Sequence, residues 1–343
     1  MERPSILELS RAHLAETLAA WGEPAFRAVQ VWQGIYRQVA PSAESLTGLP
    51  KSLRLRLDEA FTFRRLEVRG EARSDDGQTV KVALGRPGET RSVEAVRMGY
   101  RDRTTLCIST QAGCAMGCTF CATGQMGFAG QLTAGEMIEQ VLYFAARERV
   151  SNIVFMGMGE PFHNYDATLE AVDRMNDREG MAFGARRMTL STVGLVPQIE
   201  RFTQERRQVN LAVSLHAATD DVRDRLLPIN RKYPLEVLLR ACREYVRITG
   251  RRLTFEWALI RDVNDGEDQA LVLATRVRGL NCHVNLIPLN PTAGYPGEAS
   301  PRQRAAAFRS ILTARGIPCT VRVRRGLDID AGCGQLASRT SAQ

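Results

Sequence analysis

From residue 104 onward, the chain alternates short β-forming runs with helical stretches, and this alternation limits the possible folds. The expected strands are 104–110, 152–156, 187–191, 209–215, 252–259, 282–287 and a last one at 319–323. The expected helices are 134–148, 164–177, 195–205, 234–248, 265–278 and 301–315. Strands that alternate with helices form a parallel sheet with right-handed crossovers. Six βα units are too few for a closed eight-stranded barrel, so we expect an α/β fold with an open, partial (βα)6 barrel.

The first hundred residues follow a different pattern. Apolar residues recur at helical spacing between residues 11 and 60, which predicts a small helical unit. Between residues 63 and 98 the apolar residues alternate, as in Val80, Val82 and Leu84, which predicts antiparallel strands. We therefore expect a helical accessory domain at 1–62, a β-rich connecting segment at 63–98 and a core at 99–338.

Three cysteines, Cys114, Cys118 and Cys121, follow the first core strand in the run CAMGCTFC. The next helix begins with a capping box formed by Thr133 and Glu136, so the cysteine loop lies at the carboxyl end of a strand. In α/β folds that end of the sheet binds ligands. A structural zinc ion takes four protein ligands, and a ferredoxin cluster takes four cysteines. Three thiolates therefore indicate a 4Fe–4S cluster with one open iron; a zinc knuckle with a distant fourth ligand and three structural thiols are the alternatives.

Glycine and polar residues also follow the next strands of the expected sheet. Each of them alone is more typical of a loop or a helix cap than of a ligand-binding residue. Because they fall at successive strand ends beside the cysteine loop, we expect them to form a binding ring. The candidates are Gly159, Glu160, Ser191, Ser214, Leu215, His216 and Asn290.

The other five cysteines fall into two groups. Cys242, Cys282 and Cys319 lie in helical or strand patterns and are expected to be buried apolar residues. Cys107 lies on the strand that leads into the cysteine loop, and Cys333 lies in the polar, glycine-flanked run DIDAGCGQL. Core packing gives no reason for a thiol at Cys333.

The net charge of the chain and the lengths of its apolar runs limit the kinds of partner and the cellular compartment that we expect. The net charge of +8 favours a polyanionic partner, with nucleic acid as the first candidate. The N-terminus has no apolar leader, and no uncharged apolar run approaches the roughly 20 residues that a membrane span needs. We therefore expect a cytoplasmic protein without a membrane partner, whose cysteines serve metal binding or catalysis rather than a disulfide framework.

These motifs together resemble a known family. The three-cysteine spacing, with Phe120 before the last cysteine, resembles the motif of the radical S-adenosylmethionine (SAM) enzymes. From about residue 20 to 338 the chain is similar to the dual-specificity ribosomal RNA and transfer RNA adenine-carbon-2 methyltransferases. The motifs that carry the resemblance are AFRAVQVWQGIY, LCISTQAGCAMGCTFCATG, LTAGEMIEQV, FMGMGEP, LSTVG, SLHA, HVNLIPLNP and DIDAGCGQL. The departures, at 129–131 and at Gly332, touch no expected catalytic group.

The resemblance implies the cofactors and the role of each site residue. Cys114, Cys118 and Cys121 would hold the 4Fe–4S cluster, and the binding ring would contact SAM. One SAM would methylate Cys333, and a 5′-deoxyadenosyl radical from a second would activate that methyl group for addition to carbon 2 of adenine. Glu94 would then accept a proton, and Cys107 would release the product through a transient disulfide with Cys333.

The resemblance also implies the partners. We expect 23S ribosomal RNA and transfer RNA as substrates, the helical domain as an RNA-binding unit, a low-potential electron donor such as flavodoxin or ferredoxin, and a monomer. Within the same class, the alternative is the paralogue that methylates carbon 8 of adenine; Pro161 and Pro288 favour carbon 2. In another class, the alternative is a non-catalytic iron–sulfur RNA-binding sensor, which would need neither Cys107 nor Cys333.

Overall fold

The computed structural model describes residues 3–337, and within them ten strands form one sheet. Seven neighbouring strands, from β4 to β12, are parallel, whereas β1 to β4 pair antiparallel. In sheet order the strands are β1 (Glu67–Arg73), β2 (Thr79–Gly85), β3 (Ser92–Gly99), β4 (Thr104–Cys107), β7 (Asn152–Phe155), β8 (Met188–Thr192), β9 (Asn210–Ser214), β10 (Leu253–Leu259), β11 (Cys282–Pro288) and β12 (Cys319–Val321). The antiparallel strands of the connecting segment therefore extend the parallel sheet of the core.

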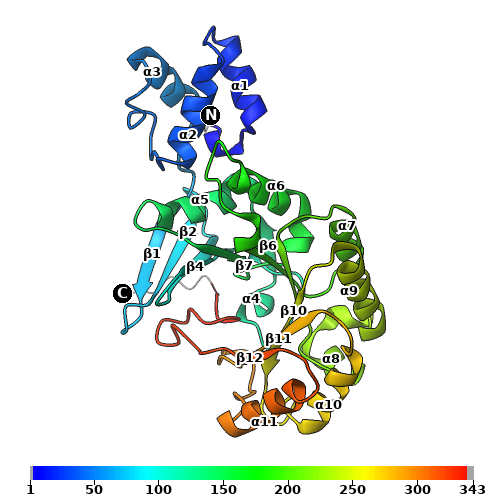
Figure 1. Ribbon diagram of the computed structural model, residues 1–343. Coiled ribbons are helices and arrows are strands. Elements are labelled where there is room, and N and C mark those ends of the chain that lie inside the picture. Colours follow the sequence, from blue (N-terminus) through cyan, green and yellow to red (C-terminus); the bar gives the residue numbers. More distant parts are fainter. Residues whose placement is uncertain (1–2, 338–343) are drawn as a thin grey trace.

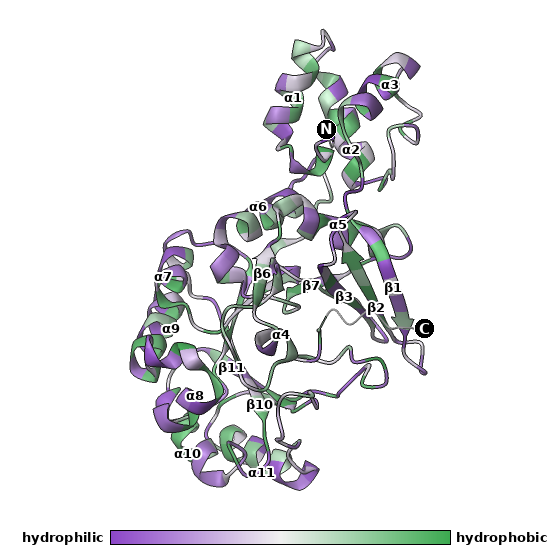
Figure 2. Cartoon of the chain, turned by 180° about the vertical axis from the view of Figure 1, so that it is seen from behind, coloured by the Kyte–Doolittle hydropathy of each residue, from purple (hydrophilic) through white to green (hydrophobic). Residues whose placement is uncertain are grey.

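Helices connect the successive parallel strands. They are α5 (Ala134–Ala145), α6 (Tyr165–Asn176), α7 (Val196–Gln204), α9 (Leu235–Thr249), α10 (Glu267–Arg276) and α11 (Arg302–Thr313). Figure 1 shows α6, α7, α9 and α10 along the outer side of the sheet. Both hydropathy colours appear on α7 and α9 in Figure 2, since one face of each helix is buried while the other is polar. This α/β partial barrel is the expected fold class.

The N-terminal helices lie at one end of the molecule, as Figure 1 shows. They are η1 (Ile6–Glu8), α1 (Arg11–Ala20), α2 (Phe26–Tyr36) and α3 (Lys51–Ala60). The buried Arg174 of α6 donates hydrogen bonds to the carbonyl oxygens of Leu7 and Glu8. The Thr133 hydroxyl, which caps α5, also donates to the Glu8 carboxylate. The helical unit is thus fastened to the core through η1.

Several short elements depart from the expected pattern. They are β5 (Gln111–Gly113), β6 (Phe128–Gln131), α4 (Ala122–Gln125), α8 (Asp220–Leu226), η2 (Pro161–Asn164), η3 (Ala185–Arg187) and η4 (Pro228–Arg231). Elements of three to seven residues are too short to produce a readable periodicity. The β5–β6 pair also depends on Gly113, whose φ is +69° and whose Cβ, if present, would lie 1.9 Å from the Gly127 carbonyl oxygen. No helix in residues 3–337 is long and apolar enough to cross a membrane.

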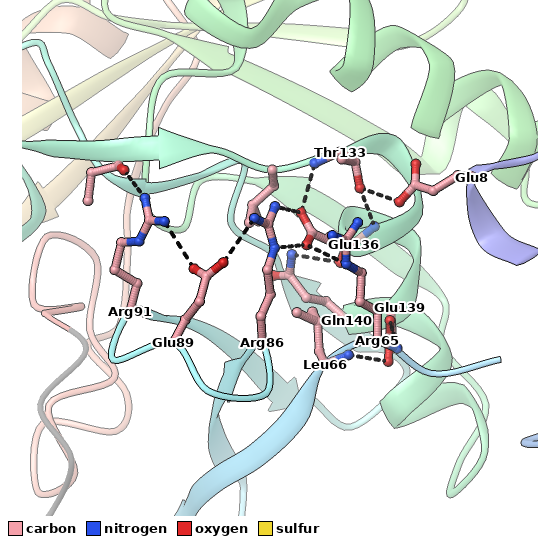
Figure 3. Close-up of polar contacts among 12 residues, drawn as sticks. Glu8, Arg65, Leu66, Arg86, Glu89, Arg91, Thr133, Glu136, Glu139 and Gln140 are labelled. Carbon is pink, nitrogen blue, oxygen red and sulfur yellow. Dashed lines mark hydrogen bonds and ion pairs between the residues drawn. The ribbon is translucent and has the colours of Figure 1, made fainter. Parts of the chain in front are cut away.

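A cluster of polar side chains joins α5 to the connecting segment, as Figure 3 shows. The Glu136 carboxylate accepts a hydrogen bond from Arg86 Nη2 at 3.0 Å. Both oxygens of Glu139 accept backbone N–H groups, from Arg65 and from Leu66, each at 3.0 Å. The next residue, Gln140, accepts the N–H of Ser109 (2.8 Å) and donates to its C=O (2.9 Å) through the side-chain amide. Helix α5 therefore fixes the chain where it leaves β4, just before the cysteine loop.

Glu139 predicts a pH dependence of stability. Burial raises the pKa of its carboxyl to about 7, although the two backbone N–H groups lower it. The unfolded chain releases this proton near the ordinary value of 4.5, so stabilisation present below that pH is lost as the pH rises towards 7. The Glu139→Gln variant does not titrate at this position. Relative to that variant, the wild-type free energy of unfolding should therefore decrease as the pH rises from 4.5 to about 7. Urea denaturation from pH 4 to 8 measures this difference, and a constant difference would contradict the assignment.

Candidate active site

One pocket opens at the carboxyl ends of the parallel strands and collects most of the predicted site residues. The cluster cysteines Cys114, Cys118 and Cys121 line it together with Cys107 and Cys333. The predicted SAM contacts that line it are Gly159, Glu160, Ser191, Ser214, His216 and Asn290. Residues more than 200 positions apart in the sequence thus face one cavity.

The three loop cysteines have a chemistry that suits cationic iron. Burial raises the pKa of the Cys114 thiol to about 12, and burial together with the neighbouring Cys121 and Cys114 thiols holds that of Cys118 well above its ordinary value. Iron binds the thiolate, so its positive charge would offset the cost of removing these protons. No group of three or more His, Cys, Asp or Glu side chains in residues 3–337 is arranged around a single ion. This does not conflict with a 4Fe–4S cube, in which each thiolate binds a different iron.

One of the predicted SAM contacts, Asn290, has a buried polar atom without a partner in the described structure. Asn290 is buried and donates through Nδ2 to the Cys333 carbonyl oxygen at 3.0 Å. Its Oδ1 is also buried and has no hydrogen-bond partner. Buried acceptors are normally satisfied, so this amide oxygen fits a ligand that donates an N–H or O–H group. An amino or hydroxyl group of SAM has this character.

Glu160 and Gly159 shape the backbone at the end of β7. The Glu160 carboxylate accepts the N–H of Phe162 at 2.9 Å and that of Val193 at 2.8 Å, which ties the end of β7 to the end of β8. Burial raises the pKa of this carboxyl to about 7, and the two N–H donors act in the opposite direction. Gly159 has φ +101°, and a Cβ there would lie 2.6 Å from the Gln111 Cβ. Only glycine fits at this position.

His216 is held as a neutral donor. Its Nδ1 accepts the backbone N–H of Ala258 at 2.8 Å, so the ring proton is on Nε2. Burial, with the nearby Arg223 charge, lowers the pKa of the ring to about 3. The Phe120 ring packs edge-on against it, with the ring centroids 5.0 Å apart. The residue also has φ +58°, which turns the chain sharply after β9.

Arg223, on the unpredicted helix α8, organises the ends of β8 and β9. This fully buried guanidinium donates to the carbonyl oxygens of Val193 (2.8 Å), Ser214 (3.2 Å) and Leu215 (3.0 Å). Burial lowers the pKa of Arg223 to about 10. Leu215 itself is buried and does not line the pocket, so only its backbone is fixed at the site. Arg223 is one of two arginines in a seven-residue helix, and the sequence gave no signal that distinguished it from surface charge.

The sequence analysis missed further charged residues that line the pocket, among them Glu256 of β10 and Arg322 after β12. Burial raises the pKa of Cys107 to about 12, and the proximity of Cys333 adds to this. The pKa of Cys333 is raised to about 11 by lost hydration, while Arg322 acts against the rise. Cys333 has an exposed surface, but that surface faces the pocket, whose walls displace much of its water. A charged residue inside the otherwise apolar run of β10 was the available signal for Glu256.

Glu94 is the one predicted catalytic side chain that does not line this pocket. It lies on β3 with 1% of its surface exposed. Its Oε1 is 3.1 Å from Lys81 Nζ, and its Oε2 accepts the N–H of Ala337 at 2.9 Å. Leu336, the preceding residue, does line the pocket. The C-terminal segment therefore connects Glu94 with the cavity.

Comparisons with known proteins agree with this geometry. Residues 108–274 match the Radical SAM superfamily, and residues 5–62 match the ribosomal RNA large subunit methyltransferase N-terminal domain. A "Probable dual-specificity RNA methyltransferase RlmN" of Chloroflexus aurantiacus is 47% identical, over 99% of this chain and 94% of the relative. "Dual-specificity RNA methyltransferase RlmN 1" of Myxococcus xanthus is 46% identical, over 97% of this chain and 94% of its own length.

A solved structure extends the agreement to the whole fold. The crystal structure of a radical SAM methyltransferase from Sphaerobacter thermophilus superposes with a TM-score of 0.94 at 50% identity. The match covers 98% of this chain and 100% of that one. Enzymes of the radical SAM superfamily use a 4Fe–4S cluster and SAM, and the donor set and the free Asn290 acceptor fit both. The chain belongs to the RlmN family of dual-specificity RNA methyltransferases, within the radical SAM superfamily.

Proposed function

We propose that this protein methylates carbon 2 of adenine in 23S ribosomal RNA and in transfer RNA. The observation that carries the proposal is that Cys107 and Cys333 line the same pocket as the three loop cysteines. A radical SAM enzyme that only cleaved SAM would need no further pair of thiols there. The names of the relatives support RNA as the substrate, and the net charge of +8 agrees with a polyanion.

The proposal assigns a role to each part of the pocket. Cys114, Cys118 and Cys121 hold the cluster. The residues that contact SAM are Gly159, Glu160, Ser191, Ser214, His216 and Asn290, together with the backbone of Leu215. When bound, the cluster and SAM supply a one-electron cleavage that produces a carbon radical, which an electron-poor aromatic C–H group requires. The other steps belong to side chains of this chain.

Cys333 acts as the methyl carrier. Its sulfur gains a methyl group from a sulfonium, whose own carbon–sulfur bond breaks. The S-methyl group then loses one hydrogen atom to the carbon radical, and the resulting S-methylene carbon becomes joined to carbon 2 of the base. Glu94 accepts the proton that carbon 2 loses. The Cys107 thiolate then attacks the Cys333 sulfur, so that a disulfide forms as the bond from sulfur to the new methyl carbon breaks, and that carbon takes up a proton to complete the methyl group. The odd electron of the radical adduct would return to the cluster. A low-potential donor such as flavodoxin or ferredoxin would supply the electron for the cleavage of SAM, and reduction of the disulfide by two electrons and two protons resets the enzyme.

RNA binding is assigned to the N-terminal helices. Helix α3 presents the exposed basic residues Lys51 and Arg56 and the half-buried Arg54 beside Leu55, whose surface is 56% exposed. Such a surface suits recognition of folded RNA through phosphates and shape. We keep the division of the chain at residues 62 and 98, and assign the protein to the cytoplasm as a monomer.

Iron content tests the cluster ligands. Anaerobic reconstitution should give about four irons and four sulfides per chain. Cys118→Ala should lose most of both, because two thiolates do not hold a cube, whereas Cys242→Ala, in the core far from the loop in sequence, should retain them. Tightly bound zinc without labile sulfide would contradict the assignment of these three cysteines as cluster ligands.

Mass spectrometry of the product tests the reaction. Wild-type enzyme with SAM and a reductant should convert adenine in both RNAs to 2-methyladenine, and Cys333→Ala should abolish methyl transfer while still cleaving SAM. 8-Methyladenine would instead identify the carbon-8 reaction. RNA binding without any methylation would favour a sensor.

Cross-linking tests the steps after the bond to RNA has formed. Cys107→Ala lacks the thiol that releases the adduct, and Glu94→Ala lacks the proton acceptor. Both should accumulate protein joined to RNA, seen as a slow species on denaturing gels, and the species should disappear when Cys333 is also replaced. If neither variant cross-links although its cluster is intact and RNA is bound, the covalent route is wrong. If only Cys107→Ala cross-links, Glu94 is excluded as the proton acceptor and the rest of the route stands.

A further inference from the structure

The basic residues of this chain are strongly biased towards arginine. Lysine plus arginine number 46, and Lys51, Lys81 and Lys232 are the only lysines. Wherever a positive charge alone suffices, this chain therefore almost always uses arginine. Lys51 and Lys232 are exposed, whereas the side chain of Lys81 is only 14% exposed. A retained lysine at a mostly buried position indicates a need for an ammonium group.

Lys81 contacts two parts of the catalytic machinery. Its Nζ is 3.1 Å from Glu94 Oε1 and donates to the Asp330 carbonyl oxygen at 3.3 Å. Lys81 of β2 pairs with Val96 of β3, and Glu94 pairs with Ala83, so the two side chains are diagonal neighbours across the strands. Asp330 lies three residues before Cys333. One ammonium group thus links the carboxylate to the segment that carries the thiol.

The ammonium has an electrostatic task at this place. Glu94 is 1% exposed, and a buried ionised carboxylate is costly unless an opposite charge and hydrogen bonds accompany it. A carboxylate must be ionised to accept a proton. Its second oxygen accepts the N–H of Ala337, which adds a hydrogen bond to the ionised form. The pair with Lys81 supplies the opposite charge.

Arginine does not offer the same contacts. An ammonium is a compact point charge with three tetrahedrally arranged donors, so it can serve Glu94 and Asp330 in different directions. A guanidinium is larger and planar, and its donors point away from one rigid plane. One nitrogen here serves both groups, 3.1 Å from the Glu94 carboxylate and 3.3 Å from the Asp330 carbonyl oxygen.

We propose that Lys81 is a positioning residue, which holds the Glu94 carboxylate in register with the Cys333 segment for removal of the carbon-2 proton. This inference rests on the proposed function. In the step that it serves, the carbon-2–hydrogen bond breaks, the proton moves to a Glu94 oxygen, and the electron pair stays with the base.

The test compares Lys81→Met, Lys81→Arg and Glu94→Gln with Lys232→Arg in the full-length, cluster-loaded enzyme. Lys232 is a matched control, since it is exposed and packs against the Tyr233 ring away from the pocket residues. Methylated Cys333 is measured by peptide mass spectrometry, cross-linked RNA on denaturing gels, and methyladenine by nucleoside analysis. Both Lys81 variants should methylate Cys333 as the wild type does, accumulate cross-linked RNA, and release methyladenine at least about tenfold more slowly. Lys232→Arg should match the wild type.

An isotope effect separates positioning from a general loss of structure. With RNA deuterated at carbon 2, slow proton removal should give the Lys81 variants a larger deuterium effect on release than the wild type shows. If either Lys81 variant releases methyladenine at a rate within about twofold of the wild type, the proposal is overturned. Loss of Cys333 methylation in both variants would also overturn it, because Lys81 would then have a structural role. If the wild type itself makes no methyladenine, it is the proposed function that fails.

Discussion

The site depends on the parallel register of β7, β8 and β9, which brings three successive strand ends to one edge of the sheet. Two buried charges fix these ends beyond the backbone ladder. Glu160 accepts the N–H of Val193 after β8, and Arg223 donates to carbonyl oxygens after β8 and β9. Because each charge is buried, its hydrogen bonds cannot be exchanged for water without a large cost, so the turns that face the ligand are held in one conformation.

Buried charge and buried thiols set the chemistry of the pocket. Burial raises the pKa of every pocket cysteine for which a shift is resolved, so each thiolate needs a positive partner. For the loop cysteines that partner would be the iron of the cluster, and for Cys333 and Cys107 it is the nearby Arg322. Two sets of sulfurs with different partners therefore line one cavity. The proposed function assigns radical generation to the first set and methyl transfer to the second.

The C-terminal segment connects these parts. Asn290 and Gln335 hold it on one side, through the Cys333 carbonyl oxygen and the Gly332 N–H, while Lys81 and Glu94 hold it on the other, through Asp330 and Ala337. The strands β2 and β3, which connect the helical unit to the core, thereby contact the segment that carries Cys333. A change in the connecting segment would therefore affect the position of Cys333.

The sequence by itself determined the parallel α/β fold, the cysteine loop at a strand end and most of the polar ring, because periodicity, capping and motif spacing are local properties. It also singled out Cys107 and Cys333 as thiols that packing does not explain. Only the tertiary structure decided that Arg223, Glu256 and Arg322 belong to the site, and that Glu94 lies behind the pocket wall against Lys81. Those facts depend on which side chains meet across strands and loops far apart in the chain. Burial and pairing of charge arise only when these segments pack together.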